Sequence, residues 1–362
     1  MRVGFDLTYA AKHEGTGTYI RNLVGALARL PDVEIIPFAR PRLALLRRLP
    51  RPLARLVNGL VSVAWLQLVV PLQARRRRLD LFHAPAFIAP LLMPCPVVVT
   101  IHDAVPFIFG QRNKQLWSHY LRAFLGVSAR RATRIVTQST HAAHELAALL
   151  NLPADRIRPV PLGITAHFRP LPPADTVLPA ALGVIEPFIL FVGAGDARKN
   201  YALALRALAL LHRRGLPTPQ LVVSGNPTAE FRHLAARANA AGEARIHFLG
   251  YVSEETLIVL YNRAQALVFP SRYEGFGLPV LEAMACGCPV ICADATALPE
   301  VAGGAALLID PDDAEGLVDA LVAVLADPER AAELAAAGLA RARACTWATT
   351  AARTLAVYRE VC

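Results

Sequence analysis

The sequence predicts an α/β protein of two domains, each built on a parallel β-sheet. Short apolar runs of strand length alternate with longer helical stretches, a pattern typical of parallel sheets covered by helices on both faces. A proline-rich stretch over residues 163–187 interrupts this alternation and marks a domain boundary. With 362 residues and a hydrophobic content of 54%, the chain can bury two separate cores and is too apolar to be disordered.

The first half of the chain supplies the strands of the first predicted sheet. The candidates are Val3–Leu7, Val33–Phe38, Leu79–His83, Val97–Ile101, Arg134–Gln138 and Arg158–Pro161. Several of the stretches between them are helical in character, among them Tyr19–Arg29 and the apolar run Leu56–Leu72. We expect the first domain to cover residues 1–170, followed by a linker over residues 171–187.

The second half repeats the alternation, and we expect the second domain over residues 188–345. Its candidate strands are Phe188–Val192, Gln220–Ser224, Arg245–Leu249, Ala266–Pro270, Pro289–Cys292 and Ala306–Ile309. The alanine-rich segment Ala314–Ala344 predicts helices, and a last helix is expected from about Trp347 to Val361. Two Rossmann-like halves are the simplest architecture that accounts for this order.

The positive charge of the chain is confined to its first half. Residues 1–175 carry 23 Lys and Arg against 9 Asp and Glu, whereas residues 176–362 carry 15 against 19. Ten arginines fall between Arg40 and Arg78 with no acidic residue among them, around the apolar run Leu56–Leu72. We expect no nucleic-acid partner, because no helix-turn-helix, zinc or RNA-binding motif accompanies this charge.

The apolar run Leu56–Leu72 has two readings. We favour a buried helix packed under the first sheet and keep contact with an anionic membrane surface as the alternative. A membrane span is disfavoured, because Asn58, Gln67 and Pro71 interrupt a run of only 17 residues. The chain opens on a strand-like run without the regions of a secretory signal. We therefore expect a cytoplasmic protein, peripheral on the cytoplasmic face of the membrane if the basic segment contacts lipid.

Residues 271–291 place two carboxylates around a glycine-rich loop and a helix start. Glu274 lies in the loop, Pro279 suits the first position of a helix, and Glu282 comes one turn later. A carboxylate in such a helix can accept hydrogen bonds from a ribose diol, and one in the loop can reach hydroxyls attached to a phosphate. Backbone amides at the helix N-terminus form an anion site with Gly275, Phe276, Gly277 and Leu278. The segment predicts a sugar-nucleotide site, and two solvated glutamates are the plainer alternative.

Two cations follow the first strand of the second domain. Arg198 and Lys199 come after a turn that begins at Gly193, at the edge where parallel sheets bind ligands. As a sugar–phosphate bond breaks, negative charge grows on the leaving nucleoside diphosphate, and fixed cations stabilise that charge. We therefore expect a diphosphate here, with a solvated basic turn as the alternative.

Two features of the first domain could face a ligand. The amides of Gly15, Thr16 and Gly17 follow a strand and precede a helix, although a glycine turn without a ligand has the same sequence. His102 comes just past a buried strand, where parallel sheets place ligand-contacting residues. His83 ends the preceding strand and could be either a neighbour of the ligand or a core histidine.

Taken in order, these motifs resemble the retaining glycosyltransferases of family four, of the glycosyl transferases group one, which have the GT-B fold. Glu274 and Glu282 match the family's E-x7-E signature. The other matching segments are Gly15–Leu23, Thr100–Asp103, Phe191–Gly193, Arg198–Asn200 and Phe248–Val252. This resemblance covers nearly the whole chain. It implies two Rossmann-like domains whose parallel sheets face a central cleft, an acceptor bound by the first domain, and a C-terminal helix, residues 346–362, packed back on that domain.

The resemblance also implies a role for each matched residue. His102 and Glu274 are the expected catalytic residues, with His102 near the anomeric centre and Glu274 on the donor sugar's hydroxyls. Glu282 would hold the ribose and the two cations the diphosphate, and the leaving phosphate would itself accept the acceptor's proton. The expected donor-binding residues are Gly15, Thr16, Gly17, Gly193, Arg198, Lys199, Tyr251, Val252, Glu274, Gly275, Phe276, Gly277, Leu278 and Glu282.

Within the family, the segments Ile101–Pro106 and Trp65–Leu72 resemble bacterial mannosyltransferases of polysaccharide assembly. We therefore expect a hexose, mannose first, to move from a nucleotide sugar to a hydroxyl of a glycan, a polysaccharide or a lipid-linked saccharide. GDP-mannose is the favoured donor and a UDP-hexose the second. The alternatives are a sugar-nucleotide epimerase of GT-B fold and a non-catalytic sugar-nucleotide-binding protein.

We expect neither a cofactor nor a metal ion. Asp310 and Asp312 have the Asp-x-Asp spacing of metal-dependent transferases, but they precede a helix, where capping is the simpler role. The six cysteines include no Cys-x-x-Cys pair, which favours free thiols over a zinc site or disulfides.

Overall fold

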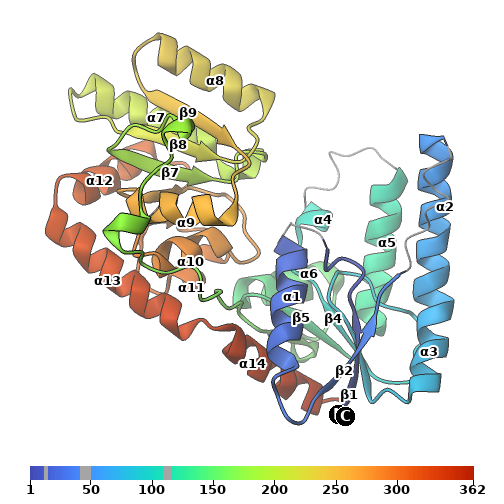
Figure 1. The fold of residues 1–362 in the computed structure, drawn as a ribbon. Helices are drawn as coiled ribbons and strands as arrows, with labels where there is room; N and C mark the ends of the chain where they lie inside the picture. Colours follow the sequence, from blue (N-terminus) through green and yellow to red (C-terminus); the bar gives the residue numbers. More distant parts are fainter. Residues whose placement is uncertain (12–14, 41–49, 109–115) are drawn as a thin grey trace. The chain divides into compact units, whose positions relative to one another are not determined.

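The computed structural model describes residues 1–11, 15–40, 50–108 and 116–362, which form two compact units (Figure 1). The N-terminal unit comprises Met1–Gly163 and Trp347–Cys362, and the C-terminal unit comprises Ile164–Thr346. Residues 164–187 thus belong to the C-terminal unit, ahead of the expected boundary at residue 170. One reason is Asn262, whose side chain bonds the backbone of Arg169 and Leu171.

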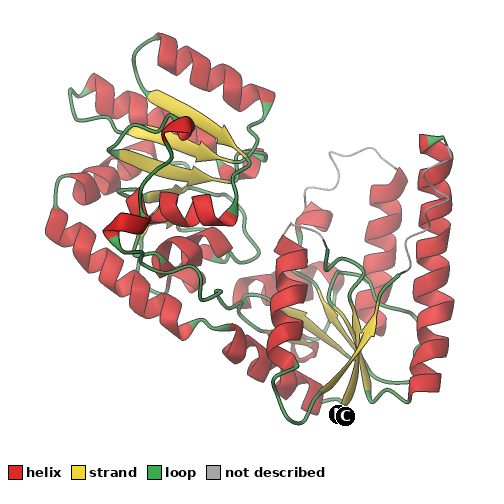
Figure 2. Cartoon of the chain, viewed as in Figure 1, coloured by secondary structure: helices red, strands yellow, loops and turns green. Residues whose placement is uncertain are grey.

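The N-terminal unit is built on a parallel six-stranded sheet with the order β2-β1-β3-β4-β5-β6. Its strands are β1 (Arg2–Asp6), β2 (Glu34–Phe38), β3 (Leu81–Ala84), β4 (Val97–Thr100), β5 (Arg134–Thr137) and β6 (Ile157–Pro159). Its helices include α1 (Gly15–Leu27), α2 (Arg51–Ala64), η2 (Trp65–Val69), α3 (Val70–Arg77), α4 (Val105–Ile108), α5 (Leu116–Arg131), α6 (Thr140–Leu150) and α14 (Trp347–Arg359). Strands β3 and β4 are wholly buried, as expected for a sheet covered on both faces (Figure 2).

The last helix of the chain belongs to the N-terminal unit. Helix α14 packs against α1. Near the end of α14, the hydroxyl of Tyr358 lies 2.5 Å from Nδ1 of His83. The side chains of Tyr358, His83 and their neighbour Thr354 are fully buried. Residues from the C-terminal end of the chain therefore complete the core of the N-terminal unit.

The C-terminal unit has a second parallel six-stranded sheet with the order β12-β11-β10-β7-β8-β9. Its strands are β7 (Phe188–Val192), β8 (Gln220–Ser224), β9 (Arg245–Gly250), β10 (Leu267–Phe269), β11 (Val290–Ala293) and β12 (Leu307–Ile309). Its helices include α7 (Tyr201–Arg213), α8 (Ala229–Ala240), α9 (Glu254–Arg263), α10 (Leu278–Ala285), α11 (Leu298–Ala302), α12 (Ala314–Leu325) and α13 (Pro328–Ala344). Every predicted strand is present, and the two parallel sheets confirm the predicted fold class.

The apolar run of the first domain departs from the favoured expectation. It forms a continuous helix, α2-η2-α3, but only Val70 and Ala74 of the run between residues 56 and 77 are buried. The prediction of a buried helix is wrong for most of this length. Three of the ten arginines between Arg40 and Arg78, at positions 42, 47 and 48, lie outside the described residues.

Candidate functional site

Two charged residues predicted for the site lie where the strand order of the C-terminal sheet reverses. Strand β7, the first strand of this unit, lies between β8 and β10, so connections leave its two sides in opposite directions. Ligands of open parallel sheets bind outside the carboxyl ends of the strands at such a switch point. Lys199 follows β7 and Glu274 follows β10, so the two segments highlighted by the sequence meet at this edge.

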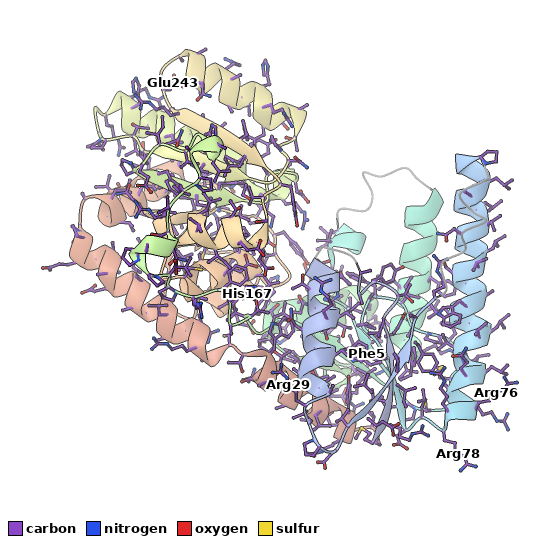
Figure 3. The ribbon with its side chains drawn as sticks, in the orientation of Figure 1. Phe5, Arg29, Arg76, Arg78, His167 and Glu243 are labelled. Atoms are coloured by element: carbon purple, nitrogen blue, oxygen red, sulfur yellow. The ribbon has the colours of Figure 1, made fainter. Side chains whose placement is uncertain are left out.

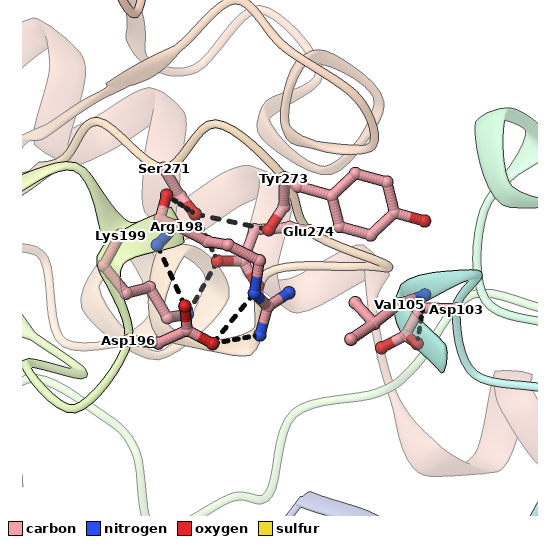
Figure 4. Close-up of polar contacts among 8 residues, drawn as sticks. All are labelled: Asp103, Val105, Asp196, Arg198, Lys199, Ser271, Tyr273 and Glu274. Carbon is pink, nitrogen blue, oxygen red and sulfur yellow. Dashed lines mark hydrogen bonds and ion pairs between the residues drawn. The ribbon is translucent and has the colours of Figure 1, made fainter. Parts of the chain in front are cut away.

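Lys199 and Glu274 form a close ion pair at the switch point (Figure 4). Lys199 Nζ lies 2.6 Å from Glu274 Oε1, and the Ser271 hydroxyl donates to the same oxygen at 2.6 Å. The two charged side chains are only 17% and 14% exposed. Both contacts fall on Oε1, and Oε2 accepts no hydrogen bond from the described chain, which leaves it available to hydroxyls of a ligand.

Arg198 is oriented by the residue that begins its short helix. Asp196 caps the 3-10 turn η7 (Ala197–Lys199) by accepting from the backbone amide of Arg198, and it also binds that residue's guanidinium. The Nε–Oδ2 and Nη2–Oδ2 distances are 2.8 and 2.6 Å. Asp196 thereby fixes the orientation of a guanidinium, the group whose geometry suits phosphate oxygens.

The glycine before these cations has a steric reason. Gly193 has φ 94°, and a Cβ added there would lie 3.0 Å from Cε of Lys199. Any side chain at residue 193 would therefore strain the backbone and displace the lysine.

Helix α10 begins and ends where the sequence predicts. Gly277 is its N-cap with φ 108°, Pro279 occupies the first turn, and Gly287 follows the end with φ 75°. A Cβ at Gly277 would come within 2.7 Å of the Leu298 side chain, so this position requires glycine for both backbone and packing reasons. The first turn of α10 exposes backbone amides that suit an anion.

Glu282 lies one turn into α10 and is partly buried. Its Oε2 accepts a hydrogen bond of 2.9 Å from the hydroxyl of Tyr261, a fully buried residue of α9. Desolvation raises the pKa of Glu282 to about 7, and the Tyr261 hydrogen bond opposes this shift only in part. Near neutral pH the carboxyl group is thus poised between its neutral and charged forms. Val252 and Tyr251 follow β9 in the same unit, and Tyr251 is 76% exposed.

His102 occupies the corresponding edge of the N-terminal sheet, just past β4. It is 8% exposed, and its ring lies edge-on to those of Tyr19 and Phe87 at centroid distances of 4.9 and 5.3 Å. Gln138, just past the neighbouring strand β5, directs its amide nitrogen at His102 Nδ1. This contact assigns the ring proton to Nε2, which is buried and has no hydrogen-bond partner among the described residues. Burial lowers the pKa of His102 to about 4, so the ring is neutral at neutral pH.

The structure also places the two other features of the N-terminal unit that the sequence singled out. His83 is fully buried between the hydroxyls of Tyr358 and Thr100, at 2.5 and 2.8 Å, which identifies it as a core histidine. Gly15 begins α1, so the residues Gly15, Thr16 and Gly17 form the first helical turn and not a preceding loop. Gly17 is buried while Gly15 is exposed.

The aspartates with Asp-x-Asp spacing make contacts within the protein. Asp310 accepts from the backbone amide of Asp312, and Asp312 pairs with Arg272 at 2.5 Å. The cap of α12 is Asp313, so the capping role expected for Asp310 and Asp312 falls on the next residue. Across the part of the chain that the structure describes, no group of three or more His, Cys, Asp or Glu side chains is arranged to hold a metal ion. All six cysteines are free thiols.

Several residues of these sites are not among those predicted from the sequence. Gln138 and Ser271 each follow a strand of a parallel sheet, so the rule that selected His102 would also have selected them. Asp196 precedes the two cations and has the residue type of a helix cap. Tyr261, by contrast, reaches Glu282 from a different helix, and no local pattern indicates that contact.

Comparisons with protein families identify both halves of the chain. The family "Glycosyltransferase Family 4" matches residues 13–168, and "Glycosyl transferases group 1" matches residues 181–341. O-antigen chain mannosyltransferase B of Escherichia coli is 34% identical over 77% of this chain and 74% of its own length. The serotype-specific mannosyltransferase WbdA of Escherichia coli is 28% identical over 72% of this chain, which spans only about a third, 33%, of that protein.

Solved structures share the fold over the whole described chain. Sucrose-phosphate synthase from Thermosynechococcus elongatus has a TM-score of 0.72 with 22% identity, covering 99% of this chain and 98% of its own. Anabaena HepE, solved with UDP and glucose, has a TM-score of 0.73 with 18% identity, covering 99% and 100%. These neighbours have the GT-B fold. The expected family is thereby confirmed, and the chain is a glycosyltransferase that belongs to family 4, with the GT-B fold.

Proposed function

We propose that this glycosyltransferase moves mannose from GDP-mannose to a hydroxyl of a growing polysaccharide or lipid-linked saccharide, with retention of anomeric configuration. The observation that carries the proposal is the cluster of Lys199, Glu274 and Arg198 at the C-terminal switch point. Two cations beside a carboxylate support the proposal, because a nucleotide sugar joins a diphosphate to a sugar with hydroxyls. The choice of mannose is supported by the named activities of the relatives, and HepE's ligands make a UDP-hexose the second donor.

The residues act mainly through electrostatics and position in this proposal. Lys199, freed from part of its contact with Glu274, and Arg198 stabilise the charge that develops on the leaving diphosphate. Glu274 contacts hydroxyls of the donor sugar, and Glu282 holds the ribose. In the N-terminal unit, His102 offers its neutral ring to sugar hydroxyls. The leaving phosphate accepts the proton of the attacking hydroxyl, so no separate base is needed. The enzyme acts in the cytoplasm, at an anionic membrane surface when its acceptor is lipid-linked.

A donor panel tests the proposal. GDP-mannose, UDP-glucose and their free nucleotides are compared by thermal shift and by acceptor-dependent release of nucleoside diphosphate. We expect the largest shift and the only acceptor-dependent turnover with GDP-mannose, and an α-configured product by NMR. Conversion of the donor without an acceptor would instead indicate an epimerase, and binding without any turnover would indicate a non-catalytic protein.

Metal independence is tested in the same assay. Because two cations and the amides of α10 neutralise the diphosphate in this proposal, turnover should be unchanged by EDTA. Loss of activity with EDTA and recovery with Mg²⁺ or Mn²⁺ would redirect attention to Asp310 and Asp312.

A further inference from the structure

One helix of the N-terminal unit turns an apolar face away from the protein. The helix α2-η2-α3 runs without a break from Arg51 to Arg77. Its exposed leucines, with their exposed fractions, are Leu53 (45%), Leu56 (61%), Leu60 (63%), Leu68 (68%) and Leu72 (58%). A single exposed leucine is ordinary on a protein surface, but a row of large apolar side chains on one helix forms a patch that indicates a binding surface.

A π-helical turn keeps these leucines on one face. From Leu56 to Leu72 the exposed apolar positions, with Ala64 among them, recur every four residues. In a regular α-helix each such step rotates by about 40°, so the row would drift around the axis. The segment Trp65–Val69 is π-helical, and its wider turns reverse part of this drift. We name the resulting stripe of five leucines the leucine face.

Polar residues of the same helix face the protein. Arg40 Nη1 donates to Asn58 Oδ1 at 2.7 Å and to the Ser62 hydroxyl at 3.0 Å. The backbone amide of Leu91 donates to Gln67 Oε1 at 2.9 Å. A solvated surface helix has the opposite arrangement, with its apolar side toward the protein. Over α2 and η2, therefore, exposed leucines face outward while Asn58, Ser62 and Gln67 bond inward. The buried apolar side chains that pack into the core, Val70 and Ala74, belong to α3.

The end of this helix is strongly basic. Arg75, Arg76 and Arg78 are exposed, and Figure 3 shows Arg76 and Arg78 directed away from the N-terminal sheet. No acidic residue occurs between Arg40 and Arg78. We propose that the leucine face inserts into the interfacial layer of an anionic lipid bilayer, with these arginines at the headgroups. Leucines bury apolar area and arginines attract anionic lipid, the combination that holds amphipathic helices at membranes.

The contact is peripheral. The segment Leu56–Arg77 is long and apolar enough to cross a membrane by length and composition, and only 6% of its most apolar stretch is buried within the protein. A crossing would, however, remove Val70 and Ala74 from the N-terminal core and break the bonds from Arg40 to α2. Lipid binding is measured without any sugar, so this proposal goes beyond the transfer reaction and stands or fails separately from it.

The first experiment removes the leucine face. The full chain is sedimented with vesicles of phosphatidylcholine alone or mixed equally with phosphatidylglycerol. The variant Leu56→Gln/Leu60→Gln/Leu68→Gln should lose about 100-fold in partitioning, because three exposed side chains no longer enter the apolar layer. Its circular dichroism and its turnover on a soluble acceptor should match the wild type. Leu149→Gln, a 47% exposed leucine on α6, is the matched control and should bind as the wild type does.

The second experiment removes the charge. Arg77 is left in place, because it donates to the Pro37 carbonyl at 3.3 Å and packs over the Phe38 ring. The variant Arg75→Gln/Arg76→Gln/Arg78→Gln should bind anionic vesicles about tenfold or more weakly and lose its preference over neutral ones. Added salt should also weaken the binding of the wild type to anionic vesicles, since charges are screened over about 8 Å at physiological ionic strength.

Three outcomes overturn the proposal. Unchanged vesicle binding by the leucine variant would remove the face from any lipid contact. Absence of binding by the wild type, together with a dimer that the leucine variant converts to a monomer in analytical ultracentrifugation, would assign the face to a second copy of the chain. Wild-type protein that stays in membranes through alkaline carbonate extraction would show a spanning helix.

Discussion

The two candidate sites lie at the same edge of their respective sheets but differ in electrostatic character. In the C-terminal unit, Lys199 and Glu274 are charged partners 2.6 Å apart, and both are largely removed from water. In the N-terminal unit, His102 is neutral and is surrounded by the rings of Tyr19 and Phe87 and the amide of Gln138. A site with fixed charges suits a ligand whose charge changes, whereas a neutral site suits sugar hydroxyls. This difference is the reason why our proposal assigns the diphosphate to the C-terminal unit.

The largest effect is expected from Glu274→Gln, which removes the charge from the C-terminal site. Turnover should fall by about 100-fold to 1,000-fold, with a smaller change in donor affinity, because contacts to the reacting sugar tighten in the transition state. Steady-state kinetics with a varied donor measure this. Asp312→Asn is the control: it neutralises an exposed carboxylate that pairs with Arg272 in the same unit, and turnover should be nearly unchanged. Equal losses in affinity and turnover would reduce Glu274 to a ground-state binding role.

Glu282→Ala is expected to weaken donor binding by about 1.5 to 3 kcal/mol, since it removes a charge-assisted contact to the ribose. Because the pKa of Glu282 is raised to about 7 and the carboxylate form is the acceptor, wild-type affinity should also decline as pH falls below 7. Tyr261→Phe should move this decline to higher pH, since the tyrosine hydroxyl lowers the pKa of its partner. Isothermal titration from pH 6 to 8.5 provides the data, and an unchanged dissociation constant in folded Glu282→Ala would refute the ribose role.

The neutral character of the N-terminal site predicts acid sensitivity of the fold. Burial lowers the pKa of His102 to about 4, below the ordinary value of 6.5, so the unfolded chain binds more protons between these values. The stability from the neutral ring is present above pH 6.5 and is lost as pH falls toward 4, by about 1.5 kcal/mol between pH 6.5 and 5. Urea unfolding at these two pH values measures the loss. In His102→Gln, the loss of stability between these pH values should be smaller by about 1.5 kcal/mol. His83, whose pKa is also lowered by burial, should still contribute to the loss that remains. An identical pH dependence in the variant would contradict a buried neutral His102.

The smallest effect is expected at Gln138, which positions His102. Gln138→Leu should lower turnover about tenfold, because the His102 ring is no longer held in one tautomer, and donor affinity should change little. Gln138→Glu should instead retain the contact as an acceptor, raise the pKa of His102 and move the acid limb of the pH–rate profile to higher pH. A purely structural role would give equal losses for both variants without any shift of the profile.

Local sequence patterns are enough to predict the strands of this protein and the ends of one site helix. The alternation of apolar runs predicts every strand of both sheets, and Gly277, Pro279 and Gly287 predict where α10 begins and ends. These features depend on backbone preferences and side-chain periods within a few residues, which the sequence displays directly. The position of Lys199 and Glu274 at one edge also follows from local reasoning, because each lies in the loop after a strand of a parallel sheet.

Tertiary structure decided the contacts between segments that are distant in the sequence. His83 proved to be a core residue because Tyr358, from the last helix, meets its ring, and Gln138 meets His102 because β4 and β5 are neighbours. The leucine face is the clearest case, since an apolar helix has the same sequence pattern whether protein or lipid covers it. Only the position of Asn58 and Gln67 against the protein showed which side of that helix turns outward. The sequence sets which surfaces avoid water, whereas packing decides which of them the chain itself covers.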